Sequence, residues 1–388
     1  MTLHPADRLA FDKAMVTQPV WNRFNTAGEA LGLPENVLLH AGPPFPDIPS
    51  VTRPILNSAC VAAVFEGLAR DFDQAEAMIG AGEILLKPAQ DHDVVTPLAA
   101  VVSASMPLHT VYDAWRGQQR VYAPINGGSR PAMRLGLRSE AVLNHIRWLN
   151  TRFLDVLQGG LAEGIALVPL AVMGLQGGDD CHGKTPVAGA ALAAELIDRS
   201  PNGVQDEDAL EFLHSSPSLF LNLWMAATKI MMKLAEGIGG SSFVTAAGGN
   251  GLETGIQISA LPGRWFTVPA TPPVGAFDVD LPPDRALGAI GDSAVVDAFG
   301  LGAMARGLTQ PEDPAALRSS ALSVQAHPYF RSMNIKLGST ARAAVEEGVG
   351  PIISLGILDR KGDAGRLGGG LYDMPVTPFE AAMKAIPS

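Results

Sequence analysis

The segment that most constrains this chain is a polar, glycine-flanked octapeptide, Gly178-Asp179-Asp180-Cys181-His182-Gly183-Lys184-Thr185. It lies between an apolar run, Ile165 to Leu175, and an alanine-rich segment, Pro186 to Ile197. Ionisable groups near a protein core are costly unless they are paired. Two acids, a thiol, an imidazole and an ammonium in one turn between two segments that look buried therefore indicate a functional site.

The composition indicates a compact protein with many tight turns. Of 388 residues, 47% are hydrophobic and 17% are charged, with 42 Gly and 30 Pro. This length allows two or three domains. The formal net charge is -11 and there is no cluster of Lys and Arg, so we do not expect nucleic-acid binding. A small anionic substrate remains possible, because local cations and backbone amides can hold one.

Cysteine usage and hydropathy predict the cellular setting. Neither Cys60 nor Cys181 belongs to a C-x-x-C pair, so we expect no structural zinc and no disulfide framework. Two free thiols suit a reducing cytosol. The N-terminus lacks the apolar core of a signal peptide, and the run from Ile165 to Leu175 is far short of a membrane span. We therefore expect a cytoplasmic protein without membrane contacts.

Apolar periodicity and turn residues predict a mixed α/β (α+β) fold with glycine-rich loops. We expect several domains: an N-terminal α/β region at 1–135, a mainly helical region at 136–240 that carries the octapeptide, and a C-terminal α/β region at 241–388. Asn250-Gly251 predicts a hairpin. Helices are expected at 5–15, 57–70, 139–158, 206–213, 218–236, 314–324 and 341–347, and strands at 83–86, 99–103, 121–125, 242–247, 254–260, 265–268 and 351–358.

Two glycine motifs are similar to nucleotide-binding loops, but the residues around them argue against that function. The octapeptide matches G-x-x-x-x-G-K-[ST], a loop that needs a strand before it and a helix after it. Asp179 and Asp180 would place uncompensated negative charge in its phosphate cradle. An ATP-using enzyme is therefore only a lesser alternative. We interpret Gly300-Leu301-Gly302-Ala303-Met304-Ala305 as a closely packed helix, because no acid follows at the spacing of a dinucleotide site.

His182, Asp179 and Asp180 are the candidate catalytic residues. A catalytic metal usually has three protein ligands, and only one His is nearby in sequence, so no metal and no cofactor is expected. Two interpretations of His182 stay open. It could act as a general acid-base catalyst, or a neighbouring carboxylate could simply hold it in a structural role. Cys181 lies beside acids that disfavour its thiolate, so we interpret it as structural.

Other polar residues lie next to glycines or inside apolar segments. The glycine-bordered points are Gly248–Gly251, Gly263–Phe266, Gly291–Ser293 and Gly368–Gly370. Each alone is typical of a plain turn, but together they offer amides and polar groups that could hold a small planar anion. Asn222 lies in an apolar helix and needs hydrogen-bond partners. A helix-to-loop hydrogen bond would also explain it.

A series of motifs runs in order from about residue 38 to the C-terminus. They are Leu39-His40-Ala41-Gly42-Pro43-Pro44, Ala59-Cys60-Val61 with Phe65-Glu66-Gly67, Ser103-Ala104-Ser105-Met106-Pro107, Gly178-Asp179-Asp180 with His182, Phe220-Leu221-Asn222-Leu223, Asn250-Gly251, Arg264-Trp265-Phe266-Thr267 and Gly291-Asp292-Ser293-Ala294. In this order they resemble the YlbE-like family, also called AllG. Because the match is co-linear, it is more specific than any one short motif.

The resemblance implies a multi-domain α/β protein with a helical insert and a role in anaerobic purine or allantoin breakdown. It implies one subunit of an oxamate carbamoyltransferase, in a hetero-oligomer with a protein similar to acyl-CoA synthetase and a third subunit, or alternatively a homodimer. The implied reaction moves a carbamoyl group between oxalurate and phosphate, giving oxamate and carbamoyl phosphate.

Three departures from the family pattern keep a second function open. Gly127 stands where the family usually has Glu, and Gly249 where it tends to have Arg. Near the end, the segment from Ser354 to Asp359 replaces an Asn-Thr-Gly-Ile-Ala-His-like stretch, so that Asp359 stands in place of the His. These losses favour the alternative of a non-catalytic scaffold or regulatory subunit that binds a small anion.

The leading hypothesis gives each polar residue a role in carbamoyl transfer. His182 would move the proton, oriented by Asp179 or Asp180. Arg264 would hold the substrate carboxylate or phosphate, because a guanidinium suits planar anions. This hypothesis depends on one spatial expectation, that His182 faces Arg264 across a shared pocket. The expected substrate-binding residues are Arg264, Asn250, Asn222, Asp292, Ser293, Gly178 and Lys184.

Overall fold

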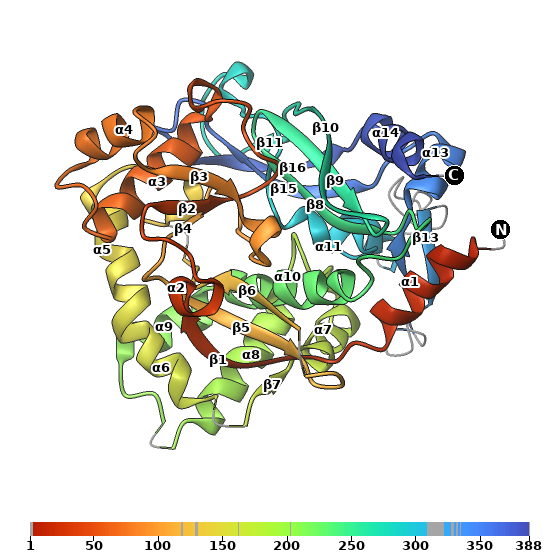
Figure 1. The fold of residues 1–388 in the computed structure, drawn as a ribbon. Coiled ribbons are helices and arrows are strands. Elements are labelled where there is room, and N and C mark those ends of the chain that lie inside the picture. The colour runs from red at the N-terminus through yellow and green to blue at the C-terminus, as the bar shows by residue number, and fades with distance from the viewer. Residues whose placement is uncertain are drawn as a thin grey trace.

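The computed structural model describes residues 3–117, 119–128, 131–161, 163–201, 203–308, 322–326, 330, 333 and 335–387. One long helix, α10 (Ser218–Lys233), crosses the middle of the molecule, and several sheets and helices surround it (Figure 1). Nearly all of its side chains are buried, including Leu219, Leu223 and Ile230. A helix that is apolar on every side has to be enclosed, and its central position satisfies that requirement.

The first sheet is antiparallel and has the strand order β6-β5-β1-β7. α10 packs against β1, β5 and β6. The short strand β7 pairs with β1, so the expected N-terminal and middle regions share this sheet. The division at 135 and 240 stays a prediction. The strands are β1 (Pro19–Thr26), β5 (Pro107–Asp113), β6 (Arg120–Pro124) and β7 (Ile165–Ala166).

A small mixed sheet lies beside the first one, with the order β3-β2-β4. β2 runs parallel to β3 and antiparallel to β4, and α3 packs against β2, β4 and α4. Its elements are β2 (Val37–His40), β3 (Leu85–Pro88), β4 (Val101–Val102), α3 (Arg53–Phe65) and α4 (Phe72–Gly80).

Two further sheets form the C-terminal part, with orders β10-β9-β8-β12 and β11-β16-β15. The hairpin expected at Asn250-Gly251 is confirmed: it joins β8 to β9, and Gly251 has a φ of 86°, where glycine is favoured. The strands are β8 (Val244–Asn250), β9 (Glu253–Ile258), β10 (Leu261–Pro269), β11 (Val274–Phe277), β12 (Ile290–Gly291), β15 (Ile352–Leu358) and β16 (Arg366–Asp373).

Most of the expected helices are confirmed, with small shifts at their ends. The stripe at 139–158 forms a nearly continuous helical segment made of α5, a π-helical turn at Leu149–Phe153, and α6. The helix expected at 314–324 lies largely outside the described residues, and 323–326 is strand β13, which pairs with β14. The elements are α1 (Pro5–Met15), α5 (Glu140–Trp148), α6 (Leu154–Gly159), α9 (Glu207–Ser215), α13 (Ala341–Glu347), β13 (Ser323–Ala326) and β14 (Lys336–Ser339).

The octapeptide joins two helices. The apolar run before it forms α7 (Leu167–Gln176), and α8 (Pro186–Arg199) follows it. A phosphate-binding loop needs a strand in the first position, so the similarity to that motif is accidental. Three further helices are α2 (Ala27–Leu31), α11 (Ala294–Ala298) and α14 (Thr377–Ala385).

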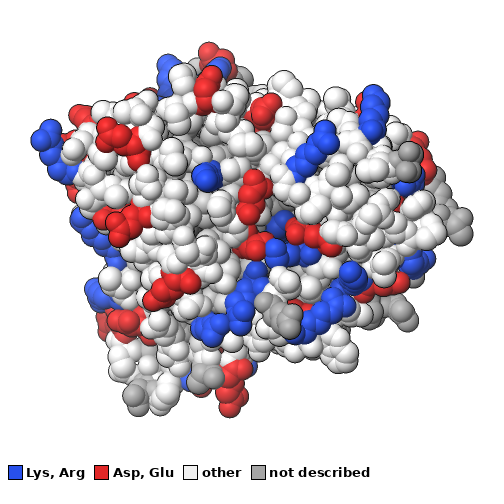
Figure 2. Space-filling view, in the orientation of Figure 1, with Lys and Arg blue, Asp and Glu red and all other residues white. Residues whose placement is uncertain are grey.

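One face of the molecule shows how its charged side chains are distributed. On the face in Figure 2, basic and acidic side chains are interspersed. Across the described ranges, no helix combines the length and the hydrophobicity that crossing a membrane requires.

Candidate functional site

A cavity of about 730 Å³ lies where the octapeptide, α10 and the last sheet meet. A neighbouring hollow of about 630 Å³ shares part of its lining, including His182 and Lys184. Both are large enough to take a small-molecule ligand. The polar residues that line the larger cavity are Asn126, Arg134, Asp179, Asp180, His182, Lys184, Ser218, Asn222, Ser293, Ser354 and Arg366. Gly178 also lines it.

Asp180 builds the turn that carries the imidazole, and its charge also favours the protonated ring. Its Oδ1 accepts hydrogen bonds from the backbone N–H groups of His182 and Lys184, each at 2.8 Å. Its own backbone N–H donates to the Lys184 carbonyl at 3.0 Å. Cys181, between these contacts, has a φ of 63°, in the left-handed region, and its thiol is buried. The local bonds of Asp180 thus fix the direction in which His182 leaves the loop.

Asp179 caps the start of α8. Its Oδ2 accepts a hydrogen bond from the Ala188 N–H at 2.9 Å, as expected for an acid at a helix N-terminus. Burial raises the pKa of Asp179 despite this bond. The expected partner of the imidazole ring is therefore corrected: Asp180 positions His182 only through the His182 backbone N–H, and Asp179 bonds to the start of α8.

His182 is oriented by Asp297, a residue 115 positions away in the chain. Its Nδ1 contacts Asp297 Oδ2, and the carboxylate is fully buried on α11. Asp297 Oδ1 also accepts from the backbone N–H groups of Ala303 at 2.7 Å and Ser354 at 3.1 Å. Because these bonds fix the acid, the imidazole has one orientation, and Nε2 is the ring nitrogen left for a ligand.

The pKa of His182 is set by two opposing causes. Burial lowers the pKa of the imidazole, but the charge and hydrogen bond of Asp297 raise it, with a smaller contribution from the charge of Asp180, and the net shift is upward. The protonated form of His182 therefore persists to a higher pH than that of a free imidazole. A proton can be held at the cavity wall near neutral pH.

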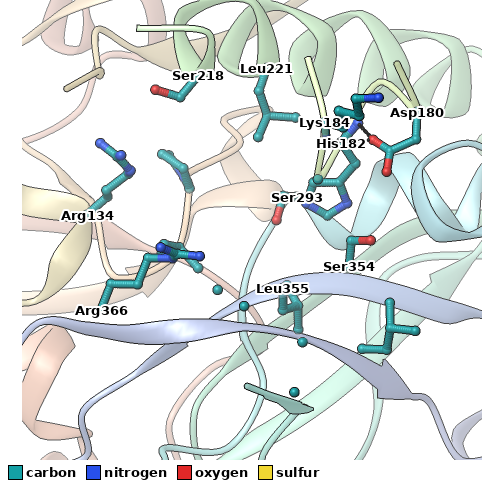
Figure 3. A pocket seen from close by; sticks show the side chains of 18 of the residues that line it. Arg134, Asp180, His182, Lys184, Ser218, Leu221, Ser293, Ser354, Leu355 and Arg366 are labelled. Atoms are coloured by element: carbon teal, nitrogen blue, oxygen red, sulfur yellow. Dashed lines mark hydrogen bonds between the residues drawn. The ribbon is translucent and has the colours of Figure 1, made fainter. Parts of the chain in front are cut away.

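Ser293 and Asp292 are neighbours in sequence, but only Ser293 lines the cavity. Ser293 lines the cavity, and Figure 3 shows its hydroxyl beside the ring of His182. Asp292 is fully buried behind it and does not line the cavity. Its carboxylate accepts from the Gly42 N–H at 2.9 Å, Gln90 Nε2 at 2.7 Å, and the N–H and hydroxyl of Thr96 at 2.9 and 3.0 Å.

Asp292 therefore joins distant segments, and its expected place in the pocket is corrected. Burial raises its pKa to about 6, although its four hydrogen bonds favour the charged form. A carboxylate at the junction of several backbone segments fixes their relative positions. It holds Ser293 in place from behind.

Asn250 and Arg264 do not line either hollow. The Asn250 amide is used by the hairpin: it donates to the Pro43 carbonyl at 2.9 Å and accepts from the N–H groups of Leu252 and Glu253. Arg264 is exposed on the edge strand β10, where its guanidinium lies 5.0 Å from the Phe266 ring centroid. The expectation that His182 faces Arg264 in one pocket is corrected, because an outward-facing edge residue does not reach the cavity.

Asn222 forms a structural hydrogen bond and also lines the cavity, so both explanations considered for it apply. Its Nδ2 donates to the Asn126 carbonyl at 2.8 Å, so the helix-to-loop hydrogen bond exists. It also lines the cavity, and its Oδ1 is buried without a partner in the described structure. A buried polar atom without a partner calls for an explanation, and a bound ligand would supply one.

The sequence patterns did not single out three residues of this site, Asp297, Arg134 and Arg366. Asp297 could have been noticed as an acid in the otherwise apolar stretch Ala294–Ala298. Arg366 lies two residues before the glycine run 368–370. Arg134 gives no signal in sequence. Within the described residues, no group of three or more His, Cys, Asp or Glu side chains is arranged to hold a metal.

The fold of the chain matches that of a solved protein. A crystal structure of a conserved protein of unknown function from Enterococcus faecalis V583 matches it with a TM-score of 0.90 and 25% identity, covering 98% of this chain and 96% of that one. The chain belongs to the family described as oxamate carbamoyltransferase subunit AllG, whose model matches residues 84–293. This confirms the family resemblance seen in the sequence.

Two curated relatives from Escherichia coli (strain K12) are similar over most of their length. The oxamate carbamoyltransferase subunit AllG is 31% identical over 373 residues, which cover 90% of this chain and 88% of the relative. The uncharacterized protein YahG is 29% identical over 406 residues, which cover 97% of this chain and 84% of the relative.

Proposed function

We propose that this chain is a catalytic subunit of a carbamoyltransferase that moves a carbamoyl group between a small ureido acid, such as oxalurate, and phosphate. Membership of the AllG family supports this class of reaction. The observation that carries the proposal is the His182 imidazole, which lines the cavity while Asp297 holds its Nδ1. A buried, oriented imidazole at a ligand-sized cavity is the equipment of a general acid-base catalyst.

The reaction needs a proton at one specific atom. A phosphate oxygen attacks the carbamoyl carbon, and the new C–O bond converts the carbonyl oxygen into an oxyanion. The C–N bond to the oxamate nitrogen then breaks, and that nitrogen leaves with the bonding pair. An amide nitrogen is a poor leaving group as an anion, so it has to receive a proton as the bond breaks. The products are oxamate and carbamoyl phosphate.

His182 is suited to deliver that proton. Asp297 raises the pKa of the imidazole, so the imidazolium is present near neutral pH. Nε2 donates the proton to the leaving nitrogen, and Asp297 stabilises the charge of the ring before donation. In the reverse direction the neutral ring takes the proton from the oxamate amide. Ser293, beside the ring, offers a hydroxyl for the developing oxyanion.

The relative's name describes a subunit, so the proposal includes partners. We propose a hetero-oligomer with an acyl-CoA-synthetase-like protein and a third subunit, with a homodimer of this chain as the alternative assembly. A cytoplasmic location and a place in purine or allantoin breakdown belong to the same proposal. The two buried free thiols, Cys60 and Cys181, support the reducing compartment.

The direct test is formation of carbamoyl phosphate from oxalurate and phosphate by the purified chain, alone and with its partner subunits. His182→Ala should lower the rate by about 10²–10⁴-fold, the usual contribution of a general acid-base residue. Circular dichroism confirms that the variant is folded. The proposal fails if the wild-type assembly makes no product.

A non-catalytic, anion-binding subunit is the second candidate, and the residues at the three departures from the family favour it. A Cβ at Gly127 would lie 2.6 Å from the Phe212 ring, and one at Gly249 would lie 2.3 Å from the Ala289 carbonyl oxygen. Asp359 is paired with Arg285. A larger side chain at Gly127 or Gly249 would therefore clash with its neighbours, and Asp359 has a structural partner of its own. If the second candidate is right, the assembly with His182→Ala keeps its activity.

A further inference from the structure

We propose that the cavity binds its substrate through two subsites: a carboxylate subsite made by Arg134 and Arg366, and an amide subsite made by Asn126 and Asn222. The ligand class is a planar acid with an amide next to its carboxylate. This inference rests on the proposed function and deepens it, because it assigns each end of the substrate to named residues. It also replaces Arg264 as the expected anion-binding residue.

Arg134 is a cation without an acidic partner among the described residues. Its guanidinium donates only to neutral oxygens: Asn126 Oδ1 at 3.4 Å and the carbonyls of Gly127 at 3.1 Å and Gly128 at 2.6 Å. Burial, with a smaller contribution from Arg366, lowers its pKa to about 10. Arg134 therefore remains charged at neutral pH, and the carbonyls fix its orientation in the cavity wall.

Arg366 brings a second guanidinium from β16 to the same end of the cavity. It pairs on one side with Asp278, at 2.8 Å from Nη1 to Oδ2, and its side chain is 47% exposed. Two like charges facing one space repel each other unless an anion lies between them. Paired guanidiniums bind a carboxylate with charge-assisted, geometrically specific hydrogen bonds.

The amide subsite follows from two unsatisfied atoms of opposite kind. Asn126 Nδ2, a donor, and Asn222 Oδ1, an acceptor, are both buried and have no partner in the described structure. The two residues are only 5% and 1% exposed, and both line the cavity. A ligand amide offers the complementary pair, a carbonyl that accepts and an N–H that donates. Binding it would satisfy both atoms at once.

The start of α10 adds a favourable field to the carboxylate end. The helix begins at Ser218, which lines both hollows, and no side chain caps its first turn. The N-terminus of a 16-residue helix attracts negative charge. This contribution supports the arginines and does not replace them.

The arrangement sets the direction of the bound substrate. Figure 3 shows Arg134 and Arg366 on one side of the cavity, with Ser218 above them, and His182 with Ser293 on the other side. A ureido acid with its carboxylate between the arginines therefore extends its carbamoyl group toward His182. The amide next to the carboxylate then lies near Arg134, where the hydrogen bonds of Asn126 to Arg134 and to Asn222 place the amide subsite.

Calorimetric titration of the purified full chain tests the carboxylate subsite without catalysis. The probes are oxamate and its neutral ethyl ester, and the chain should bind oxamate at least about tenfold more tightly, as expected for charge-assisted bonds. Arg134→Met should weaken oxamate binding about thirtyfold, Arg134→Lys about tenfold and Arg366→Met about tenfold. The matched control is Arg264→Met, which removes the same charge from an exposed site and should change the dissociation constant less than about twofold.

Oxamate and pyruvate test the amide subsite, because pyruvate replaces the NH₂ group by a methyl group of similar size. The wild-type chain should prefer oxamate about tenfold, the value of one hydrogen bond to a buried acceptor. Asn222→Leu should remove that preference while the variant still requires a carboxylate. Melting curves check that each variant is folded.

The outcomes separate this inference from the proposed function. Equal binding of oxamate and its ester, no measurable binding of either, or an unchanged dissociation constant in Arg134→Met and Arg366→Met overturns the carboxylate subsite. An oxamate preference that survives Asn222→Leu overturns the amide subsite. If binding depends on the carboxylate but the assembly transfers no carbamoyl group, the subsites are supported and the proposed chemistry is refuted.

Discussion

His182 and His109 are both buried histidines, yet their surroundings give them opposite properties. His182 lines the cavity, and Asp297 holds its Nδ1. His109 lies in the first sheet, with its ring centroid 4.9 Å from those of Trp21 and Phe24. Neither of its ring nitrogens has a partner in the described structure.

The pKa shifts of the two rings show what the difference means. Burial alone lowers the pKa of His109 to about 3, so this ring is neutral at any physiological pH. At His182 the carboxylate outweighs burial and the pKa rises. Burial makes an imidazole inert, and a fixed acid together with an open cavity makes it a proton carrier. The following predictions test this contrast.

Asp297→Asn should have the largest effect. The variant removes the charge that favours the imidazolium but keeps an oxygen for the backbone N–H groups of Ala303 and Ser354. We expect the rate of carbamoyl transfer to fall about 10²–10⁴-fold, as when a general acid is lost. The measurement is carbamoyl phosphate formation by the assembly. If the Asp297→Asn enzyme kept the wild-type rate, the acid would not be what distinguishes His182 from His109.

His109→Phe should change the pH dependence of stability and leave the transfer rate unaffected. The folded pKa of His109 is about 3 and the unfolded value about 6.5. Its contribution to stability is therefore present above pH 6.5 and is lost as the pH falls toward 3.

Urea unfolding at pH 7 and pH 5 measures this contribution. The wild-type protein should lose about 2 kcal/mol of unfolding free energy through His109 between these pH values, and His109→Phe should not lose it. His40, whose pKa burial lowers to about 4, contributes in the same sense to both proteins. If the unfolding free energy changed equally between pH 7 and pH 5 in both proteins, the pKa of His109 would not be lowered by folding.

The pH profile of the reaction should move when Asp297 is replaced. The imidazolium donates the proton, so the rate from oxalurate should fall as the pH rises through the raised pKa of His182. Without Asp297, burial lowers that pKa, and the decline should begin at a lower pH. One unit of displacement changes the rate about tenfold on this limb. Superimposable profiles for wild type and Asp297→Asn would contradict the role of Asp297.

Arg264→Met should have the smallest effect. Arg264 is exposed and contacts Phe266 outside the cavity, so the Michaelis constant for oxalurate should change less than about twofold. A large increase would restore the original expectation that this residue binds the substrate.

The helices and the hairpin could be predicted because local patterns determine them. The stripe from 139 to 158 and the apolar segment of α10 both follow helical periodicity, and Asn250-Gly251 marks a tight turn. His182 and Asn222 could also be selected, because polar groups between apolar segments need partners. Local patterns thus located part of the site.

The partners of these residues could not be predicted, because they come from distant segments. His182 is bonded to Asp297, 115 residues away, and nothing near either residue indicates the pairing. Arg264 and Arg134 both lie near glycines and look alike in sequence. Only the fold places Arg134 in the cavity wall and Arg264 on an outer strand. The sequence therefore indicated the family and some of the residues that line the cavity, but not which distant residues surround them.

The wall of the cavity runs from Pro97 to Leu371, and the Asp292 carboxylate links it to segments as early as Gly42. A ribosome must therefore synthesise the chain through Leu371 before the whole cavity wall is present. A nascent chain or a fragment that ends before residue 371 therefore lacks part of the cavity wall.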